Sequence, residues 1–224
     1  MTDTSSRIPT EKAIMEVVGT AILLFTIQVS VSLQAALAPL AIGVVLVSIV
    51  FAGGPVSGAH YNPGISLAIF VRGGGHICAK TMGLYWVSQI IGGIIGGLLG
   101  GYVTSGYSTC SIGDGFSMGQ ALTSEVIFAF VLCFVVLGVA TNAKASDNHY
   151  YGLAIGFVVM AGAASVGPIS GGAFNPAVAL GLSVSSGFSG FSFALAVSAA
   201  NLIGGALAAL VFKAVIIEEY ESIA

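Results

Sequence analysis

The sequence predicts an all-α membrane protein with six transmembrane helices and two re-entrant half-helices, arranged as an inverted repeat. Three observations lead there: the chain is very apolar, its apolar runs are long enough to cross a bilayer, and its two halves match. Of 224 residues, 56% are hydrophobic and 7% are charged, whereas a soluble domain has about 25% charged residues. This composition excludes a soluble protein, and a formal net charge of −3 gives no reason to expect a nucleic-acid partner.

Six apolar runs predict the membrane spans, because a helix needs about 20 residues to cross the hydrocarbon core. They lie at residues 13–33, 37–54, 79–101, 118–140, 150–169 and 192–214. The N-terminus is polar and has no short apolar core followed by a small-residue cleavage site, so we expect no cleaved signal peptide. The first run should therefore remain as a helix.

The basic residues predict the orientation in the membrane. All six fall before span 1, between spans 2 and 3, between spans 4 and 5, or at the end of span 6: Arg7, Lys12, Arg72, Lys80, Lys144 and Lys213. Short loops rich in Lys and Arg stay on the cytosolic side. We therefore expect both termini in the cytosol. His149, on the cytosolic loop between spans 4 and 5, is a candidate pH sensor because imidazole titrates near neutral pH.

The two halves of the chain read as copies of each other. Three pairs match at nearly one offset: Glu16 and Glu125 at the heads of spans 1 and 4, Asn62 and Asn175 in Asn-Pro pairs, and Gln89 and Asn201 before Ile-Gly-Gly. Each half holds three spans, so the second half enters the membrane from the opposite side. Such inverted repeats place their functional site near the midplane, where the halves meet.

The repeat divides the chain into five segments. We expect a cytosolic N-terminal tail at 1–12, a first half at 13–104, an extracytosolic linker at 105–117, a second half at 118–214 and a cytosolic C-terminal tail at 215–224.

The two Asn-Pro pairs read as helix starts inside the membrane. Asn is a preferred residue just before a helix, and Pro suits its first turn. The runs that follow, GISLAIF and AVALGLS, are too short to span but long enough for half a crossing. Irregular backbone at this depth is tolerated only where it is buried or lines water. The sequence therefore predicts a water-filled path between two half-helices.

On these features the chain resembles the aquaporin, or major intrinsic protein, family. The resemblance covers residues from Glu16 to about Lys213 and is carried by the six spans, the two Glu residues, SGAHYNP in the first half and SGGAFNPA in the second. It implies that two loops meet at the centre of a pore. The motif residues would be Asn62, Pro63 and Gly64 in one loop and Asn175, Pro176 and Ala177 in the other. Gly64 departs from the usual Ala, which predicts a looser contact there.

The resemblance also implies roles for these groups. The Asn62 and Asn175 amides would orient a single file of water, turning each oxygen inward and interrupting proton conduction. Two opposed helix N-termini make a positive field at the midplane, which disfavours cations. We expect Glu16 and Glu125 to accept hydrogen bonds from the loop backbones and His60 to line the cytosolic vestibule. In this family, glycine contacts such as those in IIGGIIGGLLGG would support a homotetramer.

Four family positions form the selectivity filter, and counting from the two Asn residues puts them at Ile42, Ala163, Gly172 and Val178. The set has no aromatic, His or Arg, so we expect a wide apolar ring. It predicts passage of water and of small uncharged solutes such as urea, ammonia and hydrogen peroxide, with glycerol at the upper end of size. The sequence NPAV resembles the tonoplast intrinsic branch, which favours a vacuolar or other internal membrane, with the plasma membrane as the alternative.

Two other functions remain as alternatives. A secondary transporter of a small polar solute also uses inverted repeats, but it normally couples to ions through intramembrane carboxylates. A structural membrane protein with a closed pore would show no permeability. We expect no enzyme, because no nucleophile-base set or metal cluster is visible, and the three cysteines show no ligand spacing. No cofactor is expected.

Overall fold

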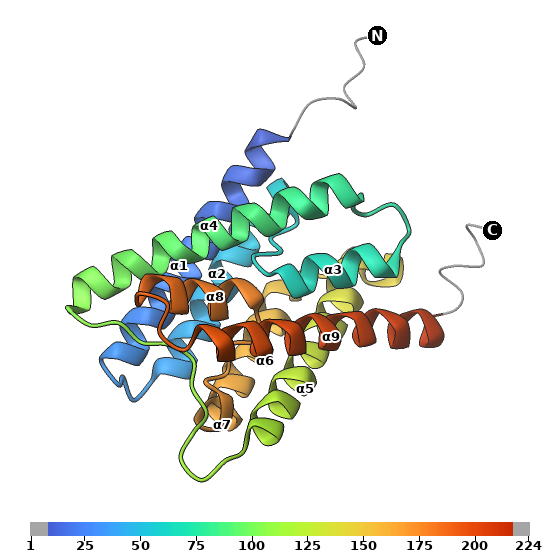
Figure 1. The fold of residues 1–224 in the computed structure, drawn as a ribbon. Helices are drawn as coiled ribbons and strands as arrows, with labels where there is room; N and C mark the ends of the chain where they lie inside the picture. Colours follow the sequence, from blue (N-terminus) through green and yellow to red (C-terminus); the bar gives the residue numbers. More distant parts are fainter. Residues whose placement is uncertain (1–8, 217–224) are drawn as a thin grey trace.

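The computed structural model describes residues 9–216, which form helices joined by turns and loops without a strand in that range (Figure 1). The outer parts of both expected tails, residues 1–8 and 217–224, lie outside the described residues. The elements are α1 (Thr10–Ser32), α2 (Ala38–Ser57), α3 (Pro63–Arg72), α4 (Ala79–Thr104), α5 (Met118–Val136), η2 (Leu137–Thr141), η3 (Ala143–Ala145), α6 (Tyr151–Ser165), α7 (Gly167–Ser170), α8 (Pro176–Ser185) and α9 (Phe191–Val215). The predicted all-α fold is confirmed.

Five of the expected spans are long, apolar helices: α1, α2, α4, α9, and α5 together with η2. The fifth expected span, 150–169, differs. Helix α6 ends at Ser165 after 15 residues, about 22 Å at 1.5 Å per residue, and the short α7 follows. Pro168 explains the break, because proline lacks a backbone N–H and disfavours a helical residue before it. The crossing at this position is therefore made by an interrupted segment.

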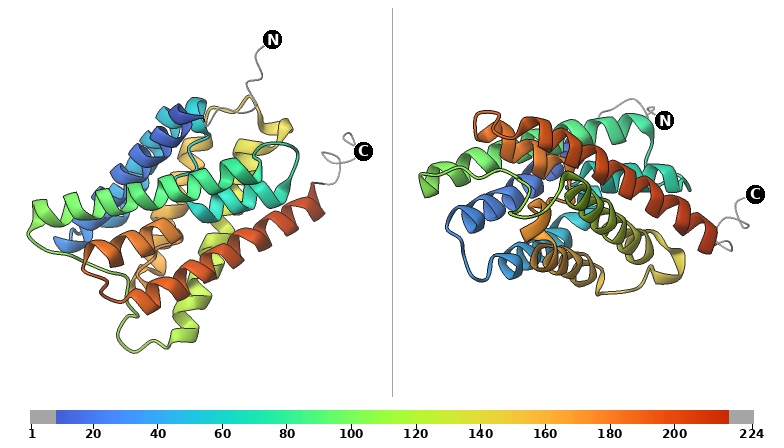
Figure 2. Two further views of the ribbon diagram at one scale, coloured as in Figure 1. Left: turned by 45° about the horizontal axis from the view of Figure 1, so that its top comes forward. Right: turned by 60° about the horizontal axis from the view of Figure 1, so that its bottom comes forward.

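The helices pair according to the repeat. Helices α1, α2, α3 and α4 correspond to α5, α6, α8 and α9. In each half the first and last spans pack along each other, and α2 packs against α6 across the two halves. Each half-helix is held mainly by the last span of the opposite half, α3 by α9 and α8 by α4. The start of α1 and the end of α9 lie at the same end of the bundle (Figure 2).

The glycine series of α4 packs against other helices of the same subunit. A Cβ added at Gly96 would collide with the backbone of Ala21 in α1, and one added at Gly97 would lie 2.5 Å from the Ser185 hydroxyl of α8. Small residues let membrane helices approach closely. The series therefore brings α1 and α8 against α4, so it lends no support to the contact between subunits for which the sequence suggested it.

The outward faces of the helices carry large apolar side chains. Exposed examples include Ile14, Val87, Ile91, Tyr102, Ile127, Phe157, Ile203 and Leu210. A soluble protein rarely exposes so much contiguous apolar surface. These faces fit a surrounding of lipid.

Candidate functional site

Both Asn-Pro pairs begin half-helices in the same way. The Asn62 side chain accepts a hydrogen bond from Gly64 N at 2.7 Å, and the Asn175 side chain accepts one from Ala177 N at 2.9 Å. Both Asn residues have extended backbones, with φ of −157°, and Pro occupies the first turn of each helix. Each Asn Oδ1 thus caps its own helix, which leaves the amide Nδ2 for other partners.

The amide groups join the two loops at the centre of the molecule. Asn62 Nδ2 donates to the Phe174 carbonyl and Asn175 Nδ2 donates to the Tyr61 carbonyl, both at 2.9 Å. Tyr61 and Phe174 have φ of 48° and 50°, a left-handed conformation that is uncommon for bulky residues and often marks functional sites. Since an amide carries two hydrogens, each Asn keeps one hydrogen beyond this bond.

Two buried carboxylates hold the loops from behind. The Glu16 oxygens accept from Ser57 Oγ at 2.6 Å, His60 N at 3.0 Å and Tyr61 N at 2.7 Å. The Glu125 oxygens accept from Ser170 Oγ at 2.6 Å, Ala173 N at 3.0 Å and Phe174 N at 2.8 Å. Both Glu side chains are fully buried. The two sets of bonds are copies, and they satisfy loop N–H groups that neither helix nor water reaches.

The repeat is less symmetric at the amide side chains that lie beside the two Glu residues. Gln89 Nε2 donates to Glu16 Oε2 at 2.8 Å. Asn201 lies beside Glu125, but its side-chain amide atoms make no hydrogen bond that satisfies both distance and angle among the described residues. Asn is one methylene shorter than Gln, and its contact with the carboxylate falls outside good hydrogen-bond geometry. Glu16 therefore has one well-formed amide bond more than Glu125.

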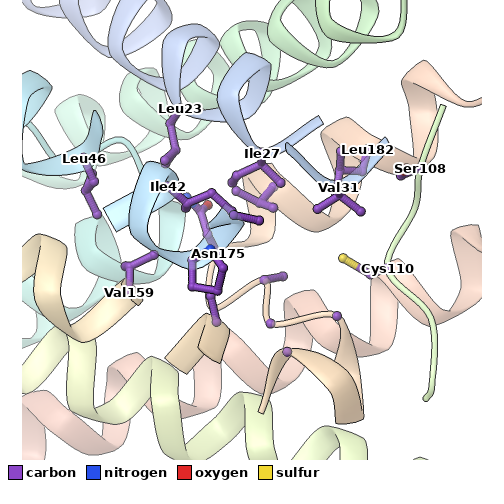
Figure 3. A pocket seen from close by; sticks show the side chains of 18 of the residues that line it. Leu23, Ile27, Val31, Ile42, Leu46, Ser108, Cys110, Val159, Asn175 and Leu182 are labelled. Atoms are coloured by element: carbon purple, nitrogen blue, oxygen red, sulfur yellow. The ribbon is translucent and has the colours of Figure 1, made fainter. Parts of the chain in front are cut away.

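The four inferred filter positions line one cavity, about 420 Å³ in volume, together with both Asn residues: Ile42, Ala163, Gly172 and Val178. Figure 3 shows side chains such as Ile27, Ile42 and Asn175 converging on it from different elements. No charged side chain belongs to its lining within residues 9–216. Ala163 and Gly172 contribute almost no bulk to this wall, and Ile42 and Val178 contribute apolar side chains.

A second cavity, about 560 Å³, opens toward the end of the bundle where α1 begins. Its lining includes Lys12, Ser57, Thr141 and Tyr151, and His60 lines both this cavity and the first one. The structure thus places His60 at the boundary between the two cavities. His149 is exposed and is absent from the lining that its neighbours Ser146 and Asn148 join.

A comparison with family models decides the identity. The family described as Major intrinsic protein matches residues 4–212. The chain belongs to the major intrinsic protein family. Members of this family are channels rather than enzymes, as the sequence predicted.

Known relatives and structures agree with this assignment. Aquaporin TIP2-3 of Zea mays is 35% identical over 170 residues, covering 75% of this chain and 67% of the relative. Aquaporin TIP2-3 of Arabidopsis thaliana is 34% identical over 171 residues with the same coverage. The X-ray structure of the aquaglyceroporin from Plasmodium falciparum superimposes with a TM-score of 0.83, covering 97% of this chain and 100% of that one, at 18% identity. That last similarity establishes the fold alone.

Nothing in the sequence indicates that the linker between the halves of this major intrinsic protein lines the cavity. Ser108, Thr109 and Cys110 all contribute to its wall, and Figure 3 shows the Cys110 sulfur pointing into it. Ser108 bonds Ser32 at 3.1 Å and Thr109 donates to the Ser189 carbonyl at 3.2 Å, which ties the linker down. Burial raises the pKa of the Cys110 thiol to about 12, so it stays protonated at neutral pH.

Gly64 is more closely surrounded than the sequence suggested. A Cβ added there would lie 3.1 Å from Asn62 Oδ1 and 3.4 Å from the Asn201 carbonyl. The alanine variant, Gly64→Ala, should shift these atoms by a few tenths of an ångström and change the free energy of unfolding by less than about 1 kcal/mol, since helix propensity offsets the crowding. Water flux per inserted channel should match that of the unmodified protein in stopped-flow measurements. A severalfold loss of flux would show that the pore uses this space.

Proposed function

We propose that this chain conducts water together with small uncharged solutes, namely urea, ammonia and hydrogen peroxide, with glycerol near the upper size limit. The observation that carries this is the uncharged cavity in which Ile42, Ala163, Gly172 and Val178 surround the two Asn amides. Bulky or charged groups at these positions would narrow the path and add fixed donors. Here the four filter positions are apolar, and the Asn hydrogens are the donors that meet a solute at the centre.

Exclusion of ions and protons follows from the two half-helices. The N-termini of α3 and α8 meet at the loops, so their partial positive charges oppose a cation at the midplane. Asn62 and Asn175 each offer the pore one amide hydrogen, which turns the oxygen of a passing water toward the centre. Adjacent waters then cannot pass a proton along the file.

The membrane, orientation and assembly are part of the same proposal. Lys12 is in the first turn of α1 and Lys213 near the end of α9, and these two helix ends lie together (Figure 2). Lys213 Nζ donates to the Val71 carbonyl and Arg72 donates to the Thr141 carbonyl, so basic side chains gather there, which supports cytosolic termini. The similarity to TIP-type aquaporins supports a vacuolar or related internal membrane. The apolar outer faces fit a homotetramer embedded in lipid, each subunit with its own pore.

The test is reconstitution into proteoliposomes with light-scattering assays of water, urea, glycerol and ammonia in parallel. We expect water, urea and ammonia to equilibrate faster than in empty vesicles, at rates indifferent to proton or sodium gradients. Water flux without uptake of urea or ammonia would contradict the wide-filter proposal. Dependence on an ion gradient would indicate a secondary transporter, and absence of all permeability would indicate a closed structural protein.

A further inference from the structure

A chain of buried hydrogen bonds runs from Glu16 to the pore. Gln89 Nε2 contacts Glu16 Oε2 at 2.8 Å and Ser66 Oγ at 3.1 Å. Ser66 Oγ also contacts the Asn62 carbonyl at 3.2 Å and His60 Nδ1 at 3.0 Å. The side chains of Glu16, Gln89 and Ser66 are all fully buried. His60, at the other end, borders both cavities.

The donor and acceptor groups of the partners determine which atom donates in each of these hydrogen bonds. An ionised Glu16 carboxylate only accepts, so Gln89 turns its NH₂ group toward it, and the second hydrogen of that group points to Ser66. A hydroxyl has one hydrogen to give and two lone pairs. The Asn62 carbonyl accepts only, so Ser66 satisfies all three contacts by donating to Asn62 and accepting from both Gln89 and His60. The opposite arrangement would set the Ser66 and Asn62 oxygens against each other.

We propose that Ser66, oriented by Gln89, is a positioning residue that holds His60 as the tautomer with its proton on Nδ1, so that Nε2 faces the pore as an acceptor. No hydrogen bond to Nε2 is found within residues 9–216, and the residue lines both cavities. Gly58 leaves room beside it, since a Cβ added there would lie 3.3 Å from Nε2.

The second half of the protein has no equivalent series of hydrogen bonds among its described residues. The positions equivalent to His60 and Ser66, 113 residues later, are Ala173 and Ala179, which carry neither acceptor nor hydroxyl. Of these two equivalent loop positions, only the first therefore carries a side-chain acceptor. The role of this acceptor rests on the proposed function. Waters whose oxygens face the Asn amides point their hydrogens outward, and His60 Nε2 accepts the outward hydrogen on its side.

The tautomer can be read directly by nitrogen NMR of the full-length protein in lipid bilayers, with histidine labelled at its ring nitrogens. Protonated and bare imidazole nitrogens resonate far apart, and His60→Gln identifies the His60 signals by their loss. We expect a protonated Nδ1 and a bare Nε2, and in Ser66→Ala a mixture of both tautomers. A protonated Nε2 in the unmodified protein, or unchanged His60 signals in Ser66→Ala, would overturn the proposal. This spectrum does not depend on which solutes the channel passes.

Flux measurements test the consequence for water. Ser66→Ala places at this position the residue that α8 already carries, so the variant should fold, and its water permeability per channel should fall up to about fivefold, the equivalent of one ordinary hydrogen bond. Ser183→Ala is the matched control, because Ser183 is equally buried in α8 but bonds the Ser189 carbonyl away from the cavities. A tautomer shift in Ser66→Ala with unchanged water flux would refute the role given to Nε2 in the water file.

Discussion

Replacing Glu125 by leucine is expected to destabilise the protein by at least about 3 kcal/mol, because three buried donors lose their acceptor and each costs about 1–3 kcal/mol. Those donors are Ser170 Oγ, Ala173 N and Phe174 N. The Phe174 carbonyl is also the partner of Asn62, so the change should reach the opposite loop. Thermal unfolding of the solubilised protein, followed by fluorescence of the single tryptophan, should show a lower midpoint.

Two variants sharpen this result. Glu16→Leu should cost more than Glu125→Leu, because Glu16 also accepts from Gln89 whereas Asn201 makes no such bond to Glu125. Glu125→Gln keeps the shape and one oxygen, so its effect should be smaller, with one loop donor left unpaired. Equal midpoints for the two leucine variants would show that the Gln89 bond adds no net stability. An unchanged midpoint in Glu125→Leu would refute the scaffolding role itself.

Local chemistry was enough to predict the half-helices. An Asn-Pro pair followed by a short apolar run, repeated in both halves, indicates a capped helix start, and the structure has both Asn side chains capping their helices. The bonds from each Asn amide to the opposite loop carbonyl were beyond the sequence, because they depend on the left-handed backbone at Tyr61 and Phe174. Neither residue type favours that conformation, so no local signal announces it.

Other parts of the site depend on packing that the sequence does not show. The apolar run at 150–169 conceals the break before α7, although Pro168 is a visible cause of it. The linker residues Ser108 and Cys110 line the cavity only because the linker is tied to α1 and to the turn before α9. From the sequence, Ser57 and Ser170 look like small packing residues. Their repetition 113 residues apart was the signal that their hydroxyls have a role, which is to donate to Glu16 and Glu125.

Replacing Val178 by arginine should convert the solute range of the channel. Val178 is buried in the first turn of α8 and lines the 420 Å³ cavity together with Ile42 and Ala163. A guanidinium there would take up part of the cavity and add five donors and a positive charge. We expect urea permeability to fall at least about tenfold, which corresponds to about 1.4 kcal/mol of added barrier. Water, which is smaller and can bond the new donors, should keep most of its permeability in the same light-scattering assay.

Val178→Leu separates width from charge at the same position. Leucine adds volume to the wall without adding a donor. If fixed donors contribute to selection, Val178→Leu should reduce urea flux less than Val178→Arg does, and if width alone decides, the two variants should reduce it equally.

The introduced arginine must also tolerate the positive end of the α8 dipole, and its hydrogens need acceptors. The hydroxyls of Ser108 and Thr109 in the cavity wall can accept such hydrogens. Undiminished urea flux in Val178→Arg would show that solutes pass elsewhere than through this cavity, and the filter assignment would then fail for all four positions together.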